Sequence, residues 1–276
     1  MSRKRRSYVT GVVAIAVSVF VFLIPFAFIL LTASKDRQES AALEFSLPQQ
    51  FMLFENVWEV IQTRDFMLLT AFANSTILTV ASVTLMVLFA AMVGWVLQRR
   101  KSRINTMVNF LVLAGLIIPP AVVPTIWVLQ GLELFGTLHG LVLIEVTFGL
   151  SFSILMFRAF IAAIPRELDE AATIDGAGPI RLFFQVAFPL LRSVIVTVIV
   201  VQAVFVFNDF QNPLYFLPGD DNATVQLTLY NFQSQFNTRW NLLFTNVLLI
   251  TIPPLLMYIF FQRQIVAGMT SGAVKG

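Results

Sequence analysis

The sequence predicts an all-α polytopic membrane protein with six transmembrane helices. Of its 276 residues, 58% are hydrophobic and only 12% are charged, whereas a soluble domain typically carries about 25% charged residues. The apolar residues form long blocks, and a helix needs roughly 20 apolar residues to cross the hydrocarbon core of a bilayer. We expect helices because a helix satisfies its own backbone hydrogen bonds in lipid, and the alternation typical of barrel strands is absent.

Six apolar blocks divide a single transmembrane domain, residues 1–276. The first block follows four basic residues and superficially resembles a secretory signal peptide, but it is too long for one, so we expect a retained anchor. The expected spans cover about residues 8–33, 66–97, 104–129, 141–160, 186–216 and 241–261, and a short tail, residues 262–276, follows them. Prolines predict breaks in the third span (Pro119, Pro120, Pro124) and in the sixth (Pro253, Pro254), although proline is also common in membrane helices.

The basic residues predict the orientation of the chain. Six spans place both termini on one side, and basic residues favour the cytoplasmic side of a membrane. With the termini inside, the outer segments hold only Lys35, Arg37, Arg64 and Arg239 of the 18 lysines and arginines, and the inner segments hold the rest. We therefore expect cytoplasmic termini and contact with membrane lipid. The basic balance of the sequence is explained by topology, so no nucleic-acid partner is expected.

The residue inventory excludes several kinds of chemistry. The chain has no cysteine and one histidine, His139, which excludes disulfides and thiol catalysis and leaves little for a metal site. A nucleotide-binding P-loop needs a lysine after a glycine, and no lysine of this chain follows one. We therefore predict no catalytic residue, no metal ligand and no cofactor bound by this chain.

The segment between the fourth and fifth spans, residues 161–185, is less apolar and lies on the predicted inner side. Pro165 precedes a stretch rich in acids, and Gly176 and Gly178 follow it, which predicts a short helix over Glu167–Asp175. A second short helix is expected to start at Pro179. From the residues alone, this segment is equally well explained as an amphipathic connector at the membrane surface.

The spacing of this segment resembles a known family. Binding-protein-dependent ABC importers carry Glu-Ala-Ala, then Gly four residues on, and an Ile-x-Leu-Pro stretch ten residues after the Gly. This sequence has Glu170, Ala171 and Ala172, then Gly176, then Val186, Phe188 and Pro189. Only Val186 and Phe188 depart from the pattern, and both keep apolar bulk. The resemblance implies that the segment couples the permease to an ATPase through Glu167, Glu170, Ala171, Ala172, Asp175, Gly176 and Pro189.

Two further stretches resemble the maltose-type carbohydrate permeases of that family. The tail from Val266 to Gly276 is similar to their C-terminus, and Phe207–Phe210 is similar to their aromatic-Asn-Asp-aromatic signature, with Phe207 at a position that is often Trp. The likeness covers essentially the whole chain. It implies a type I ABC importer permease in the bacterial inner membrane, moving a carbohydrate, an oligosaccharide or related sugar.

The same resemblance implies a set of partners. These are a second permease subunit in a heterodimer, two ATP-binding cassette subunits that hold ATP and Mg, and an extracytoplasmic solute-binding protein. It also implies that the tail residues Thr270, Gly272 and Lys275 touch the ATPases, and that the outer loop with Pro218, Gly219, Asp220 and Asp221 reaches into the binding protein. A frayed terminus and a plain surface loop are the alternatives for these two segments.

Several polar residues, among them Gln202 of the fifth span, lie at or near membrane depth. Glu145 is near the outer end of the fourth span, and Asn208 and Asp209 lie late in the fifth. Ionisable groups inside a membrane are expensive and usually functional. We expect them to line the translocation pathway or to pack against neighbouring helices.

Two other function classes compete with an ATP-driven importer. An ion-coupled secondary transporter usually carries several intramembrane charges, and this chain has only Glu145 and Asp209. A membrane-embedded hydrolase needs a convergent acid, base or metal cluster, and none is recognisable in the sequence. Uptake that requires ATP and survives an uncoupler distinguishes the importer from the secondary transporter.

Overall fold

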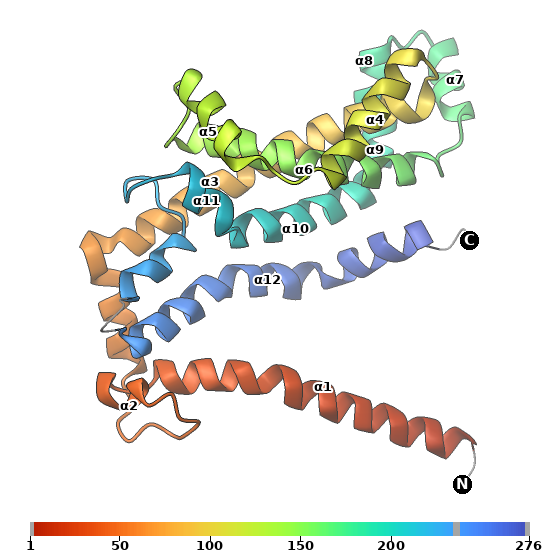
Figure 1. Ribbon diagram of the computed structural model, residues 1–276. Helices are drawn as coiled ribbons and strands as arrows, with labels where there is room; N and C mark the ends of the chain where they lie inside the picture. The colour runs from red at the N-terminus through yellow and green to blue at the C-terminus, as the bar shows by residue number, and fades with distance from the viewer. Residues whose placement is uncertain (1–2, 234–237, 274–276) are drawn as a thin grey trace. The chain divides into compact units, whose positions relative to one another are not determined.

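The computed structural model describes residues 3–233 and 238–273, and within these ranges every regular element is a helix (Figure 1). In chain order the elements are α1 (Arg3–Ala33), α2 (Arg37–Ala41), α3 (Leu53–Arg99), α4 (Arg103–Ile117), α5 (Val122–Gly131), α6 (Leu138–Ile161), α7 (Glu167–Ile174), α8 (Pro179–Leu182), the π-helical turn η1 (Phe183–Ala187), α9 (Phe188–Leu190), α10 (Arg192–Asn208), α11 (Gln211–Phe216), the 3₁₀ helix η2 (Leu227–Phe232) and α12 (Trp240–Ala273). The predicted all-α fold class is confirmed.

Four helices are each long and apolar enough to cross a membrane. They are α1 over Gly11–Ala33, α3, α6, and α12 over Trp240–Gln262. Two bent pairs meet the same criterion together: α4 with α5, and residues 179–190 with α10, with turns of 118° and 76° at the breaks. When each bent pair is counted as one span, the described part of the chain holds six spans, the predicted number.

The two groups of prolines act differently. Ile118 is extended (ψ 121°) after the last turn of α4, and Pro119 and Pro120 follow it, so the third span is broken where the prolines predict. In the sixth span α12 runs through Pro253 and Pro254 without ending. The break predicted there is absent, because membrane helices tolerate proline where other groups satisfy the freed carbonyl oxygens.

Helix α3 changes direction at the start of the second expected span. Arg64, Asp65 and Phe66 have φ values of 51°, 52° and 62°, which interrupts the helix between Thr63 and Phe66. Residues 53–62 therefore form a separate helical stretch before the second expected span, residues 66–97.

The helix bounds differ from the expected spans in two further places. The fifth expected span, residues 186–216, contains a turn at Leu191 and a second break after α10. There the Asp209 Oδ1 atom accepts hydrogen bonds from the backbone of Gln211 (2.8 Å) and Asn212 (3.3 Å), and so starts α11 as a separate short helix. The sixth helix also extends beyond residue 261, since α12 ends at Ala273.

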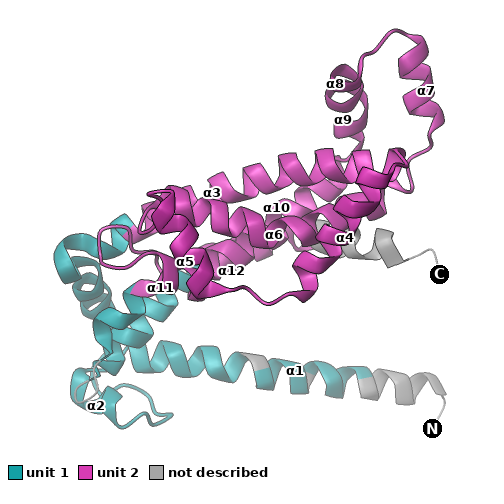
Figure 2. Cartoon of the chain, turned by 45° about the horizontal axis from the view of Figure 1, so that its top comes forward, with its two compact units in different colours: residues 1–70, 228–252 teal, residues 71–227, 253–276 magenta. Residues whose placement is uncertain are grey.

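The chain divides into two compact units, residues 1–70 with 228–252 and residues 71–227 with 253–276 (Figure 2). Buried amides join the segments of the first unit. The Asn56 side chain donates to the backbone oxygens of Ala33 (2.8 Å) and Lys35 (2.9 Å) and accepts from Asn241 (2.9 Å). These three hydrogen bonds hold the end of α1, the start of α3 and the start of α12 together.

The core of the second unit is formed by α3, α6 and α10. Its buried residues include Ala90 and Ala91 of α3, Phe157 of α6, and Val194 and Val198 of α10. Small residues let membrane helices approach closely. At Gly94 of α3, an added Cβ would lie 3.0 Å from the Cβ of Phe157, so α3 and α6 touch near the end of α3 that precedes α4. This contact fixes the surface on which α7 is mounted.

Candidate functional site

Helix α7 lies where the sequence predicts it, after the fourth apolar block. It begins at Glu167, two residues after Pro165, and its first turn holds Glu167, Asp169 and Glu170. Acids at this end stabilise a helix because they face the positive end of its dipole. The helix ends at Ile174, one residue before the predicted end at Asp175.

A glycine turn closes α7. The Gly176 backbone has φ 80°, in the left-handed region that glycine adopts most readily. The Gly176 N–H donates to the Thr173 oxygen (3.0 Å), and the Ala177 N–H donates to the Ala172 oxygen (2.9 Å). This pair of bonds is a Schellman motif, which satisfies the last carbonyls of a helix and reverses the chain.

One face of α7 is exposed, and among the described residues no side chain covers it, since no residue of α7 is buried. Leu168 is 42% exposed and Ile174 is 86% exposed. Glu170 and Ala171 are exposed as well, whereas Ala172 is half-buried. Exposed apolar side chains gathered on one helix are typical of a surface that another protein covers.

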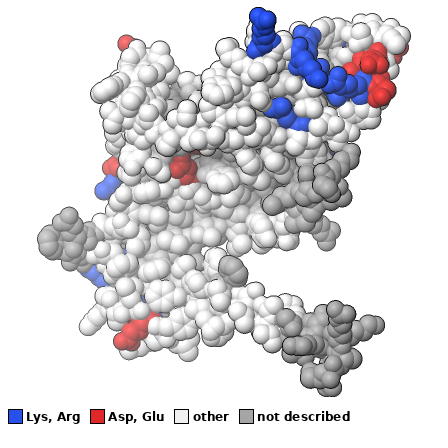
Figure 3. Space-filling model, turned by 45° about the vertical axis from the view of Figure 1, so that its right-hand side comes forward, with Lys and Arg blue, Asp and Glu red and all other residues white. Residues whose placement is uncertain are grey.

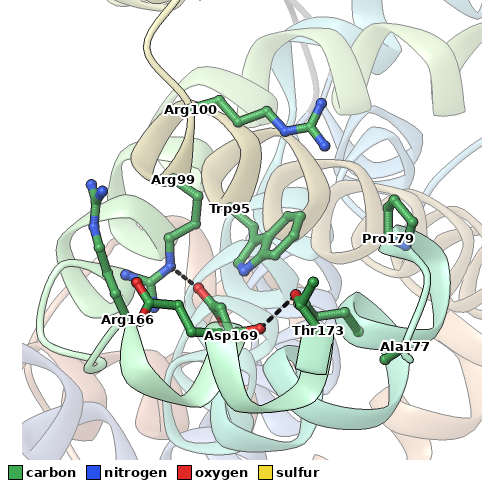
Figure 4. A pocket seen from close by; sticks show the side chains of 10 residues that line it. Trp95, Arg99, Arg100, Arg166, Asp169, Thr173, Ala177 and Pro179 are labelled. Carbon is green, nitrogen blue, oxygen red and sulfur yellow. Dashed lines mark hydrogen bonds and ion pairs between the residues drawn. The ribbon is translucent and has the colours of Figure 1, made fainter. Parts of the chain in front are cut away.

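The opposite face of α7 contacts the end of α3 (Figure 4). The Arg99 Nε atom lies 2.6 Å from the Asp169 Oδ2 atom, and Arg99 Nη2 donates to the Ile164 backbone oxygen at 3.1 Å. A cavity of about 380 Å³ lies beside this ion pair. Its walls include Trp95, Arg100, Arg166, Glu170, Thr173 and Pro179.

The elements after α7 are anchored in the core. Leu182 of α8 and Phe183 of η1 are buried, and the Phe183 ring lies edge-on to Trp95 of α3 with a centroid distance of 5.8 Å. Pro189 is exposed and sits in the first turn of α9, where proline costs no hydrogen bond. The end of α3 therefore contacts the inner segment twice, through Arg99 and through Trp95.

Charges of both signs gather at this end of the second unit. Figure 3 shows a group of lysine and arginine side chains beside a group of acidic side chains there. The exposed basic residues include Arg100, Lys101, Arg103 and Arg166, and α7 supplies the acids. Basic residues concentrated at one end of the spans support the predicted cytoplasmic side.

The outer loop that follows α11 has an exposed tip, and the residues after the tip are hydrogen-bonded to other parts of the unit. All four predicted residues, Pro218 to Asp221, are exposed. The Asn222 side chain donates to the Gly136 oxygen (3.0 Å), and Ala223 and Val225 are bonded to Asn74 (3.1 Å) and Ser75 (3.0 Å) of α3. The tip is thus presented to the outside by a loop whose base is fixed.

The three predicted intramembrane residues line one cavity of about 700 Å³ between α6 and α10. Glu145 is buried and its Oε1 atom accepts a hydrogen bond from Asn212 Nδ2 (3.1 Å). Asn208 is exposed at the cavity wall and donates to the Val204 oxygen (2.8 Å). Asp209 caps α11 as described above. The structure therefore brings Glu145, Asn208 and Asp209 together.

The predicted tail contact gains no side-chain description. Thr270 and Gly272 lie in the last turns of α12, but the Thr270 side chain and the whole of Lys275 lie outside the described residues. Among the residues that the structure describes, no group of three or more His, Cys, Asp or Glu side chains could hold a metal ion.

Several residues that contribute to these sites were not predicted from the sequence. Arg99 and Arg100 entered only as charges that set topology, and Trp95 and Asn212 were not considered. A signal existed for Arg99, because a basic side chain at the end of one inner helix is a natural partner for acids on the neighbouring inner segment.

The fold and the exposed inner helix define a membrane-spanning transport subunit. Residues 86–271 match the family described as "Binding-protein-dependent transport system inner membrane component". The chain belongs to this family of ABC transporter permeases, and it is a multi-pass protein of the bacterial inner membrane.

Similar proteins agree with this assignment. The chain is 29% identical to the melibiose/raffinose/stachyose import permease protein MelC of Bacillus subtilis, over 92% of this chain and 91% of that protein. It is 30% identical to the diacetylchitobiose uptake system permease protein NgcG of Streptomyces coelicolor, over 99% and 91%. A chain from the crystal structure of a bacterial ABC transporter that imports the acidic polysaccharide alginate has the same fold, with a TM-score of 0.81, 17% identity, and 95% and 98% of the two chains covered.

Proposed function

We propose that this chain is the permease subunit of an ATP-driven importer that moves a carbohydrate from an extracytoplasmic solute-binding protein into the cytoplasm. Relatives that span nearly the whole chain support the substrate class, since they are named for melibiose, raffinose and stachyose, for starch degradation products and for diacetylchitobiose. A solved neighbour in complex with its oligosaccharide-bound periplasmic protein supports the binding-protein partner.

The chain itself is a non-catalytic subunit, and ATP and Mg are held by two partner ATPases. Its sequence has no glycine–lysine pair from which a P-loop could be built. The energy for transport therefore reaches the chain through a protein contact, and a second permease subunit completes the membrane path in a heterodimer.

The observation that carries this proposal is the exposed face of α7, which has the Glu170 to Gly176 spacing of the family and whose apolar side chains no described residue buries. Leu168, Ala171 and Ile174 dock into a groove of the ATPase, in the manner of an amphipathic helix in an apolar groove. Glu167, Glu170 and Asp175 supply charge at the rim. Ala172, Gly176 and Pro189 shape the segment behind that face.

Movement is transmitted because α7 is mounted on the core of the second unit. When the ATPases close, the docked α7 moves, and the ion pair of Asp169 with Arg99 and the Trp95–Phe183 contact carry the displacement to α3. Semi-rigid rocking of helices is an ordinary route for such a change. Outside the membrane, the exposed tip at residues 218–221 meets the binding protein, and the tail around Thr270, Gly272 and Lys275 adds a second contact with the ATPases.

The test uses the whole complex, purified with its partner permease, ATPases and binding protein, and reconstituted into liposomes. Uptake of radiolabelled raffinose, maltotriose and N,N′-diacetylchitobiose is measured with and without ATP, and with an uncoupler. We expect uptake of at least one sugar to require ATP and to survive the uncoupler. Uptake driven by an ion gradient without ATP would identify an ion-coupled secondary transporter instead.

Two substitutions test the docking role of α7. Glu170→Lys and Gly176→Asp are expected to abolish uptake and to reduce co-purification of the ATPases, with insertion into the membrane unchanged. Glu133→Lys is the matched control, because Glu133 is an exposed acid in the turn between α5 and α6. Normal ATPase binding and normal uptake by both α7 variants would contradict the coupling role.

A further inference from the structure

The cavity between α6 and α10 combines polar and aromatic walls. It has a volume of about 700 Å³, within the range of roughly 300–1,000 Å³ that small-molecule sites occupy. Its polar lining consists of Glu145, Gln202, Asn208, Asp209 and Asn212. Its aromatic lining consists of Phe148, Phe152 and Phe205.

The cavity lies within the membrane-spanning part of the helices. At about 1.5 Å per residue, Glu145 and Phe152 are roughly 10 and 20 Å along α6 from its first residue, and Gln202 is roughly 15 Å along α10 from Arg192. Helix α6 is a candidate span by itself, and α10 is the longer part of a bent one. The cavity therefore extends from the end of the spans that is farther from α7 to about their middle.

Polar groups at this depth exclude lipid as the occupant. Asn208 is exposed on the surface of this chain, and Asp209 is half-buried beside it. An amide or carboxylate that faces hydrocarbon costs several kcal/mol. The mouth of the cavity therefore faces water or a polar surface in the assembled complex.

The back wall of the cavity is rigid. The Gln202 Nε2 atom donates to the Gly149 oxygen (3.0 Å) and to Ser153 Oγ (2.8 Å), and Asn212 holds Glu145. The absence of a side chain at Gly149 allows this close approach, because an added Cβ would lie 3.3 Å from Gln202 Nε2. Fixed polar groups bind a ligand without the cost of ordering them first.

Other side chains project towards the opening. Phe205 is 69% exposed and Phe152 is 40% exposed, and the Asn208 carboxamide oxygen accepts a long hydrogen bond from Gln226 (3.3 Å). Flat aromatic faces stack against the C–H faces of sugar rings, and amide and carboxylate groups bond to sugar hydroxyls. This combination suits a hydroxylated ligand and does not suit a lipid tail.

We propose that this cavity is a carbohydrate contact site in the translocation path, contributed by this subunit itself. Asn208 and Asp209 hydrogen-bond sugar hydroxyls, and Phe152 and Phe205 stack against the rings, while Glu145 and Gln202 hold the wall in place. The inference rests on the proposed import of a carbohydrate and adds where, on this chain, that carbohydrate is touched.

The first experiment asks whether the cavity is wet. The native chain has no cysteine, so a single Asn208→Cys substitution can be labelled on this subunit with a charged, membrane-impermeant thiosulfonate reagent in the reconstituted complex. Ile199→Cys is the control, because Ile199 is an exposed apolar residue of α10 that does not line the cavity. We expect labelling at Asn208→Cys only. Equal lack of labelling at both sites would overturn the proposal.

The second experiment asks whether the sugar touches the cavity. With whichever of raffinose, maltotriose and diacetylchitobiose the wild-type complex imports, Asn208→Ala and Phe205→Ala are expected to lower the sugar moved per ATP hydrolysed by about tenfold, the value of one good contact. ATPase activity and subunit association stay unchanged, and Ile199→Ala changes none of these. If both variants move as much sugar per ATP as the wild-type complex, the contact site is overturned and the proposed function is not. If the wild-type complex takes up sugar without ATP, the proposed function is overturned.

Discussion

Arg99, the last residue of α3, and Asp169, in the first turn of α7, form an ion pair with 2.6 Å between Arg99 Nε and Asp169 Oδ2. Their side chains are 9% and 18% exposed, so solvent screens the pair only in part. The Nε–H is not aligned for a hydrogen bond to the carboxylate, whereas Nη2 of the same side chain is bonded to the Ile164 oxygen. One guanidinium thus ties α3 to both the approach to α7 and α7 itself.

Breaking this ion pair is expected to uncouple ATP hydrolysis from transport. Arg99→Asp and Asp169→Arg each place two like charges side by side in a partly buried site, at a cost on the order of 2 kcal/mol. The sugar moved per ATP hydrolysed by the reconstituted complex should fall severalfold in each single variant. The swapped double variant should recover a substantial part of it, because the opposite charges again face each other.

The double variant also separates coupling from simple damage. If both single variants assemble normally and the swap restores nothing, the two residues act independently and the ion pair does not transmit movement. Glu133→Lys serves as the control for a reversed charge, because Glu133 lies in an exposed turn between α5 and α6.

The turn after α7 predicts an asymmetry between two neighbouring glycines. Gly176 has φ 80°, whereas Gly178 has φ −68°, and an added Cβ would meet no atom within 4 Å at either position. Gly176→Ala should therefore cost about 1–2 kcal/mol through backbone strain alone, fray the end of α7 and weaken ATPase co-purification. Gly178→Ala should be close to neutral. Equal effects of the two substitutions would show that the left-handed turn is not what the docking surface depends on.

The contact of α3 with α6 predicts a stability effect without a change of charge. At Gly94 an added Cβ would lie 3.0 Å from Phe157 Cβ and 3.4 Å from the Ile154 backbone oxygen, so Gly94→Val forces the helices apart. Overpacking of this kind costs about 1–3 kcal/mol and should lower the Tm of the detergent-solubilised complex. Gly131→Val is the control, because no atom lies within 4 Å of an added Cβ there. An unchanged Tm in Gly94→Val would mean that the two helices can separate freely.

Much of this architecture could be predicted from local sequence signals. Pro165, the acids of the first turn and Gly176 predict the α7 helix. These signals lie within a dozen residues and act on the neighbouring backbone, so they can be read from the local sequence. The fifth span was predicted less well, because residues 186–216 are almost uniformly apolar and hydropathy does not register the cap that Asp209 places on α11.

Contacts between distant segments were beyond local signals. Nothing near Asn56 indicates that its amide joins Ala33 to Asn241, and nothing near Lys35 indicates that it is buried with its ammonium bonded to the Glu44 oxygen and Ser46. The cavity between α6 and α10 could not be predicted from local sequence signals either. Glu145 and Asn208 were recognised as polar residues at depth, but only the packing of α6 on α10 brings them to one wall.

The outer loop allows the two sides of the complex to be tested separately. Replacing residues 218–221 by Gly-Ser-Gly-Ser removes the exposed tip, and it keeps the anchors at Asn222, Ala223 and Val225. We expect stimulation of the ATPases by the sugar-loaded binding protein to be lost, because the contact that reports the loaded binding protein is gone. Co-purification of the ATPases should persist, since α7 is untouched. A variant that is stimulated normally would show that the binding protein docks elsewhere, whereas loss of the ATPases would show that the loop supports the fold of the subunit instead.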